Sequence, residues 1–219
     1  MYYGYRIRWA IQQWGRRRRR LGVHWRRSSP TWWKDLVFLL GDLSLLFDVY
    51  DIACTACSPR IRPLSVREIE EAKVIFGDSL PYALIRVDQR ARIATRRYGI
   101  AYVSFLTINA WGPLPPALLL HELIHCWQYV HRGAAYIPRA LWAQRTAFGY
   151  DYRGVAHLST LSSLFELNYE QQGDVVADRY RLQRGRQPQW GAATGIDLPV
   201  YDRLLEALKK PGPARSDYP

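Results

Sequence analysis

The strongest constraint on this chain is a pentapeptide with two histidines, set in a stretch that predicts a helix. Residues 121–125 read His-Glu-Leu-Ile-His. Side chains four positions apart share one face of a helix, so His121 and His125 can hold a metal ion between them. Glu122 lies beside them, where a carboxylate can act on a metal-bound water. The simpler alternative is an amphipathic helix with two partly buried, hydrogen-bonded histidines.

The residues around the pentapeptide favour a buried helix. Pro115 and Pro116 suit its first turn, and Gly133 suits its end. Between them apolar side chains occur on almost every helical face, which is typical of a core helix. Two imidazoles and a carboxylate inside a core are costly unless they have partners, and a metal ion is such a partner. The sequence therefore favours a metal site over two isolated histidines.

A catalytic zinc ion has three protein ligands and an open position for water, so a third ligand is expected. Residues 168–184 predict a helix on which Glu170 and Asp174 lie one turn apart. We expect Glu170 to bind the metal and Asp174 to accept the outer N–H of a ligand histidine. His131 is the alternative third ligand, but the glycine that would turn the chain out of the helix before it is replaced by Gln128.

Three segments of the chain resemble a known group of proteins. They are residues 72–79 (AKVIFGDS), 119–129 (LLHELIHCWQY) and 169–180 (YEQQGDVVADRY). An H-E-x-x-H helix followed by a helix with E-x-x-G-D resembles the glutamate-zincins. More narrowly, the segments are similar to small bacterial metallopeptidase-like domains that accompany contractile injection systems and Rhs/Vgr-type secretion proteins. The resemblance covers residues 65–185 and leaves the N-terminal arm and residues 186–219 outside.

The residues and the resemblance together predict a zinc-dependent metallopeptidase, with about one zinc ion per chain and a polypeptide substrate. His121, His125 and Glu170 would be the ligands, and Glu122 the general base. A tyrosine is expected to stabilise the oxyanion, and the candidates are Tyr136, Tyr150, Tyr152 and Tyr180. The alternative is a catalytically silent, zinc-stabilised docking or effector module that binds a protein of the secretion apparatus.

The positive charge of the chain is concentrated at its N-terminus. Residues 1–34 hold ten of the 31 basic residues and none of the 19 acidic ones, interleaved with tyrosines and tryptophans. We expect residues 1–30 to form a loosely docked basic and aromatic arm. Arginine with aromatic side chains suits an anionic surface such as nucleic acid or lipid. A solvated arm that keeps the protein soluble is the simpler alternative.

An apolar run, residues 36–47, follows the basic arm. It is shorter than the roughly 20 apolar residues that a membrane span needs, so we expect no transmembrane span and an amphipathic helix over Trp32–Tyr50. The three cysteines, Cys54, Cys57 and Cys126, predict reduced thiols. The expected localisation is the bacterial cytoplasm, with contact-dependent export or peripheral membrane association as alternatives.

The remaining pattern predicts an α+β fold of the zincin type, in which a small sheet packs on a mainly helical body. We expect one domain over residues 31–210, with its metallopeptidase core at 65–185, and a loose tail over 211–219. Strands are expected over residues 83–87, 92–95 and 101–108. Further helices are expected over residues 65–76, 134–146 and 199–209.

Overall fold

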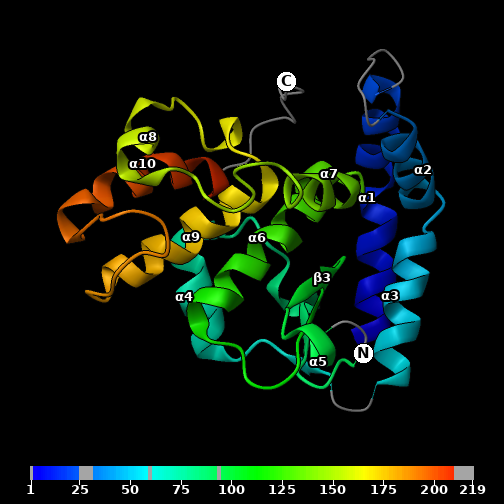
Figure 1. Cartoon of the computed structure of the whole chain (residues 1–219). Helices are drawn as coiled ribbons and strands as arrows, with labels where there is room; N and C mark the ends of the chain where they lie inside the picture. The colour runs from blue at the N-terminus through cyan, green and yellow to red at the C-terminus, as the bar shows by residue number, and fades with distance from the viewer. Residues whose placement is uncertain (1, 25–31, 59–60, 93–94, 210–219) are drawn as a thin grey trace. The chain divides into compact units, whose positions relative to one another are not determined.

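The computed structural model describes residues 2–24, 32–58, 61–92 and 95–209. The chain is mostly helical with one small mixed sheet, which confirms the predicted α+β class (Figure 1). It divides into two compact units whose segments alternate along the sequence. The first unit comprises residues 1–65, 81–114 and 126–138, and the second comprises residues 66–80, 115–125 and 139–219. Residues 31–210, predicted as one domain, fall into both units, and the tail at 211–219 lies outside the described residues.

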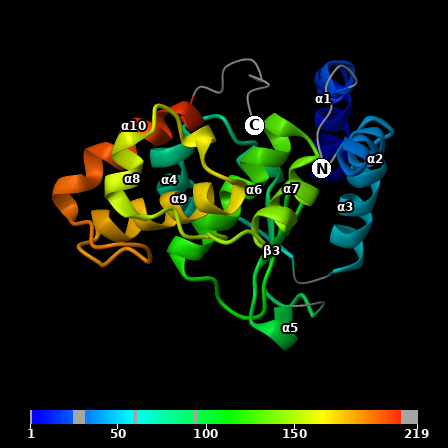
Figure 2. The same ribbon diagram turned by 45° about the horizontal axis from the view of Figure 1, so that its top comes forward.

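Three helices begin the first unit: α1 (Tyr2–His24), α2 (Trp32–Leu43) and α3 (Leu46–Cys57). α1 packs against both α2 and α3, as two views show (Figures 1 and 2). The single helix predicted over Trp32–Tyr50 is broken between α2 and α3. Leu45 has a φ of 62° there, a left-handed conformation through which a helix cannot continue.

The N-terminal segment is not the loosely docked arm that its composition predicts. Most of it is helix α1, in which Arg6 and Arg17 are buried. Arg6 contacts Asp48 and Asp51 at 3.0 and 3.1 Å, and Arg17 contacts Asp42 at 3.3 Å. Acidic residues of α2 and α3 thus neutralise buried arginines, a pairing of distant segments that composition does not reveal. Residues 25–30 of the predicted arm lie outside the described part of the chain.

The sheet also belongs to the first unit. Its order is β1-β2-β4-β3, formed by β1 (Arg62–Pro63), β2 (Arg86–Asp88), β3 (Tyr102–Ser104) and β4 (Thr107–Asn109). β2 and β4 run parallel, and the other two pairings are antiparallel. The one strand predicted over residues 101–108 is a tight hairpin, because the chain turns at Phe105 with a φ of 59°.

Two other strand predictions fail in part. A 3-10 turn, η1 (Tyr82–Leu84), takes the beginning of the strand predicted over residues 83–87. Thr95 begins a short helix, α5 (Thr95–Tyr98), instead of ending a strand, and residues 93–94 lie outside the described residues. Both errors fall on short segments, where propensity alone decides little.

The second unit is helical in its described residues. It contains α4 (Val66–Phe76), α8 (Gly154–Thr160), α9 (Tyr169–Gln183) and α10 (Leu198–Lys209), with 3-10 turns η2 (Leu164–Glu166) and η3 (Gly195–Asp197). α10 packs on α4, α8 and α9. Two helices, α6 (Pro116–Arg132) and α7 (Tyr136–Ala143), contribute residues to both units. The helices predicted from the sequence are confirmed at α4, α7 and α10, although α7 is shorter than expected.

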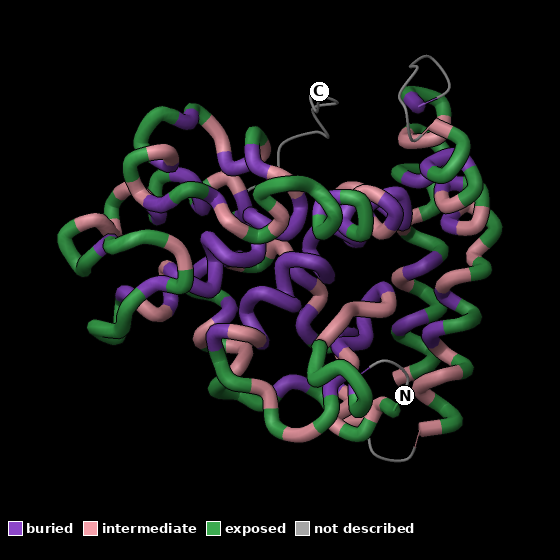
Figure 3. The backbone as a smooth tube through the Cα atoms, viewed as in Figure 1, coloured by how far each residue is buried: buried purple, intermediate pink, exposed green. Residues whose placement is uncertain are grey.

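Two helices are buried along most of their length. Every residue of α6 from Leu119 to Val130 is buried, as is every residue of α9 from Tyr169 to Asp178 (Figure 3). These two helices carry the predicted metal ligands. The polar side chains of those residues are therefore buried inside the protein. None of the described helices combines the length and the apolarity that a bilayer crossing needs.

Candidate metal centre

Helix α6 carries the histidine pentapeptide on a regular, buried turn. It begins at Pro116 and ends before Gly133, whose φ of +80° stops the helix as predicted. His121 and His125 are both buried, and their ring centroids lie 5.2 Å apart. The spacing of four residues therefore brings both imidazoles to one helical face.

Helix α9 presents Glu170 from its first turn. Asn168 caps the helix, because its side-chain oxygen accepts hydrogen bonds from the backbone N–H groups of Glu170 and Gln171, both at 2.9 Å. The side-chain oxygen of Gln171 accepts the N–H of Asn168 at 3.1 Å in return. A carboxylate in the first turn also lies at the positive end of the helix dipole. Local capping therefore fixes Glu170 and favours its ionised form.

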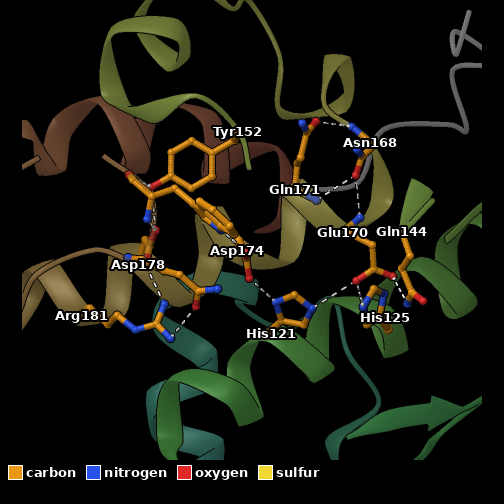
Figure 4. A network of polar contacts seen from close by, with 12 residues as sticks. His121, His125, Gln144, Tyr152, Asn168, Glu170, Gln171, Asp174, Asp178 and Arg181 are labelled. Atoms are coloured by element: carbon orange, nitrogen blue, oxygen red, sulfur yellow. Dashed lines mark hydrogen bonds and ion pairs between the residues drawn. The ribbon is translucent and has the colours of Figure 1, made fainter. Parts of the chain in front are cut away.

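The three predicted ligands come together between these helical segments. Glu170 Oε2 lies 3.5 Å from His121 Nε2 and 3.5 Å from His125 Nε2 (Figure 4). All three ligand atoms lie within 4.8 Å of one another, and all three residues are buried. Tetrahedral zinc with bonds of about 2.0–2.1 Å has ligand atoms about 3.3 Å apart, so the spacing fits such an ion. The group can therefore bind a metal ion through two imidazole nitrogens and one carboxylate oxygen.

Asp174 holds His121 in the orientation that a metal ligand needs. Asp174 Oδ1 accepts a hydrogen bond from His121 Nδ1 at 2.8 Å, which leaves Nε2 facing Glu170. The other oxygen of Asp174 accepts the indole N–H of Trp190. The hydrogen bond expected of Asp174 is therefore present, and its effect on metal binding stays a prediction.

Gly173 allows the backbone of α9 to approach the His121 ring. A Cβ atom at this position would lie 2.6–2.8 Å from three ring atoms of His121, closer than atoms tolerate. Glycine is thus required here for the close approach of the helix rather than for a special φ angle. The E-x-x-G-D pattern thereby contains a candidate ligand, space for the imidazole and the residue that hydrogen-bonds to it.

Two residues at the site have no counterpart in the sequence predictions. Gln144, just after α7, donates a hydrogen bond from Nε2 to Glu170 Oε1 at 3.0 Å, so that Oε2 faces the histidines. Trp190, in the loop after α9, donates to Asp174. Both side chains reach the site from irregular segments, where no spacing rule links a residue to a distant partner.

Without a metal ion, the charged groups of the site stabilise one another. Burial alone lowers the pKa of His121, but hydrogen bonds with Asp174 and Glu170 outweigh burial and raise the pKa from 6.5 to about 10. Burial likewise opposes protonation of His125, but the charge of Glu170 raises its pKa. Burial would raise the pKa of Glu170, but His125 and His121 hold it below its usual range. A metal ion must therefore displace protons from the histidines.

Glu122 is buried beside the group without being one of its three ligands. Its Oε2 has no hydrogen-bond partner among the described residues. Burial raises the pKa of Glu122, and the neighbouring His121 and His125 offset only part of this rise. A buried carboxylate oxygen without a partner costs free energy, which a water molecule held at a metal ion would recover. Glu122 thus fits a site that also holds a metal ion and a water molecule.

One of the four candidate tyrosines, Tyr150, lies beside His121 of the candidate metal site. The ring centroid of Tyr150 is 6.1 Å from that of His121, and its side chain is 36% exposed. Burial, and then the charges of Glu170 and Glu122, raise the pKa of Tyr150, so its hydroxyl remains protonated and can donate a hydrogen bond. The other three hydroxyls have different partners: Tyr136 with Val103 O, Tyr152 with Asp178, and Tyr180 with Glu71.

Asp178 of helix α9 forms hydrogen bonds with the loop that contains Trp190. Its two carboxylate oxygens accept the backbone N–H groups of Gln189 and Trp190 at 2.7 and 3.2 Å. One of them also accepts the hydroxyl of Tyr152 at 2.7 Å (Figure 4). A continuous set of hydrogen bonds therefore leads from this loop through Asp174 to the first histidine of the metal group.

The other candidate ligands are not part of the group. His131 packs its ring on Trp127, with centroids 4.5 Å apart. Cys54, Cys57 and Cys126, all of them described, form no disulfide bond. Of the described residues, only two histidines and one glutamate form a cluster with the spacing of a metal site.

Comparisons with known proteins give one distant relationship. Part of the chain is similar to the type VI secretion system spike protein VgrG2b of Pseudomonas aeruginosa, with 27% identity over 136 residues. The match covers 54% of this chain and 13% of that protein, so the chain spans only a small part of its relative. No family model matches the chain, and no solved structure matches it.

Proposed function

We propose that this chain is a zinc-dependent metallopeptidase that acts in association with a bacterial secretion apparatus. The observation that carries the proposal is a buried glutamate oxygen without a hydrogen-bond partner next to three buried ligand atoms. A structural zinc site uses four protein ligands, whereas a catalytic site uses three and keeps one position open for water. His121, His125 and Glu170 match the catalytic number, and Glu122 is the base available to that water.

The protein groups have separate tasks in this proposal. Zinc, when bound, would polarise the scissile carbonyl and lower the pKa of a bound water to about 7. Glu122 would accept a proton from the attacking water and release it to the leaving nitrogen. Asp174 would hold His121 in the tautomer that leaves Nε2 unprotonated. Tyr150 would donate a hydrogen bond to the developing oxyanion.

A second candidate is a catalytically silent module that zinc stabilises and that docks onto the secretion apparatus. The distant similarity to a spike protein favours it, because that similarity carries no indication of a reaction. In such a module the three ligands would be required for stability. Glu122 would be dispensable, and its replacement by an uncharged residue would relieve the cost of a buried carboxylate.

Metal content and cleavage of casein by the purified full chain test the proposal. We compare the unmodified protein with Glu122→Gln, Glu170→Ala and Tyr150→Phe. We expect about one zinc ion per chain in all but Glu170→Ala, which loses a ligand. Glu122→Gln should cleave about 10²–10⁴ times more slowly because the general base is gone, and Tyr150→Phe should lower kcat more than it changes KM.

The outcomes separate the two candidates. Zinc-loaded protein that cleaves nothing, or cleavage that Glu122→Gln leaves unchanged, would support the docking module. An unmodified protein that binds no zinc at all would contradict both candidates.

A further inference from the structure

Helix α1 carries an exposed apolar stripe in addition to the residues that it buries. Ile7, Ile11 and Trp14 are exposed, Ile11 at 59%. Their spacing of four and three residues places them on one helical face. Single exposed apolar side chains are normal on a protein surface, but an aligned series on one face marks an interaction site.

The next two helices repeat this pattern. In α2 the exposed stripe is Trp33, Val37 and Leu40, with Trp33 at 72%, again at a spacing of four and three. In α3 Leu46 and Val49 are exposed at a spacing of three. Three helices that pack on one another thus each leave an apolar series in contact with solvent.

The charges of the same helices are sorted by sign between interior and surface. All acidic residues of α1–α3 are buried: Asp35, Asp42, Asp48 and Asp51. The exposed charged residues of α1–α3 are all basic: Arg8, Arg16, Arg18, Arg19 and Lys34. The exposed surface of these helices is therefore both apolar and exclusively positive.

We infer that the exposed surface of α1–α3 docks onto an anionic lipid bilayer, with the helices lying in the headgroup interface. Helices that bind at this interface combine an apolar stripe with basic residues and tryptophan, as these three do. The apolar side chains enter the acyl boundary, while arginine and lysine contact the anionic headgroups. The buried aspartates are essential to the arrangement, since exposed carboxylates would be repelled by the same headgroups.

Two other occupants fit these observations less well. Nucleic acid would engage the arginines, but Ile11, Val37 and Val49 neither stack on bases nor bond to phosphates. A second copy of the chain would bring two surfaces of the same charge together, and their repulsion opposes association. An anionic bilayer offers both negative charge and an apolar layer beneath it.

Flotation of the full chain with lipid vesicles tests the inference. The vesicles contain phosphatidylcholine alone or mixed with phosphatidylglycerol. The apolar variant carries Ile11→Ser, Trp33→Ser and Val37→Ser, and the basic variant carries Arg8→Gln, Arg18→Gln and Arg19→Gln. Two control variants make the same types of change at two exposed residues each outside α1–α3, Val66→Ser with Ile196→Ser and Arg145→Gln with Arg186→Gln. Circular dichroism and zinc content verify that each variant folds.

We expect binding to the mixed vesicles that weakens with salt, and little binding to phosphatidylcholine alone. The basic variant should lose about fivefold in partitioning for each charge removed, and the apolar variant about tenfold or more, while the controls bind like the unmodified chain. Absence of binding would overturn the inference, as would full binding by the apolar variant, which indicates a general polyanion binder. A lipid-free dimer that the apolar variant dissociates would assign the surface to self-association instead.

Discussion

At Gly173 the backbone of α9 lies against the ring of His121. Replacement of this glycine by alanine should therefore be harmful, unlike most Gly→Ala changes in a helix. Gly→Ala within a helix normally stabilises by up to about 1 kcal/mol. Here the new Cβ would lie within 2.6 Å of the His121 ring and would displace it from Glu170. We therefore expect Gly173→Ala to weaken zinc binding about tenfold or more, measured by competition with a chelator.

Gly15→Ala is the matched control for this prediction. Gly15 lies in helix α1, and a Cβ atom at this position would meet no atom within 4 Å. This variant should gain helix stability and retain the zinc affinity of the unmodified protein. Equal zinc affinities in the two variants would show that the His121 ring can move aside without consequence for the metal.

The residues at the site differ in how well the sequence predicts them. His121, His125 and Glu170 could be predicted because helical periodicity, a property of the local chain, decides which of them share a face. Gln144 and Trp190 could not, because they reach the site from irregular segments through contacts that only the tertiary fold creates. The four tyrosines could be proposed as a set but not ranked for the same reason.

At the scale of elements, the cap of α9 links helix stability to metal binding. Asn168 accepts two backbone N–H groups of the first turn and donates to the carbonyl of Gly149 at 2.9 Å. Asn168→Ala should lower the free energy of unfolding by about 1 kcal/mol, measured with urea, because those donors lose their partner. It should also weaken zinc binding, since Glu170 belongs to the frayed turn.

Ser163→Ala provides the comparison, because Ser163 caps the 3-10 turn η2 in a similar capping box. It should cost stability without affecting zinc affinity. If both cap variants change zinc affinity alike, the effect reflects general destabilisation rather than the position of Glu170.

The ion pairs of α1 with α2 and α3 are a second property of elements. Asp48 contacts both Arg6 and Arg17, and all three side chains are buried. Asp48→Ala would leave two buried guanidinium groups less compensated and should destabilise by about 3–5 kcal/mol in urea unfolding. Asp202→Ala removes a half-exposed partner of Arg179 and should cost less than about 1 kcal/mol. Similar losses in both variants would mean that solvent screens the interior pairs.

Elements were predictable where the local pattern and the tertiary environment agree. Helices α6 and α9 were foreseen because prolines, caps and glycines mark their ends and their residues suit a buried helix. The segment that forms helix α1 was predicted to be a loosely docked arm, because arginines usually face solvent. Two of its arginines instead pair with aspartates more than 24 residues away in the sequence. The turn inside the strand predicted over residues 101–108 could not be predicted, because phenylalanine is not a typical turn residue. Phe105 nevertheless has a positive φ.

At the scale of the molecule, the two units have different chemical characters. The metal group, Glu122 and Tyr150 all belong to the second unit, whereas the apolar and basic surface of α1–α3 belongs to the first. The proposed peptidase activity and the inferred bilayer docking therefore rest on separate sets of residues. Variants of one set can test its function while the other set stays intact.

The response of stability to pH should differ between the metal-free and the zinc-bound protein. In the metal-free protein the pKa of His121 is raised from 6.5 to about 10, mainly through Asp174 and Glu170 against the effect of burial. The stability gained from protonated His121 is therefore complete below pH 6.5 and is lost as pH rises toward 10. Zinc competes with the same protons, so its stabilisation grows over this pH range.

We thus expect the difference in Tm between zinc-loaded and chelator-treated protein to widen from pH 6.5 upward, measured by differential scanning fluorimetry. Magnesium, which prefers oxygen ligands, serves as the control and should shift Tm little at any of these pH values. A difference that stays constant would mean that the metal does not displace protons from His121. A difference that narrows would place zinc elsewhere on the protein, because only a site that competes with these protons gains from their loss.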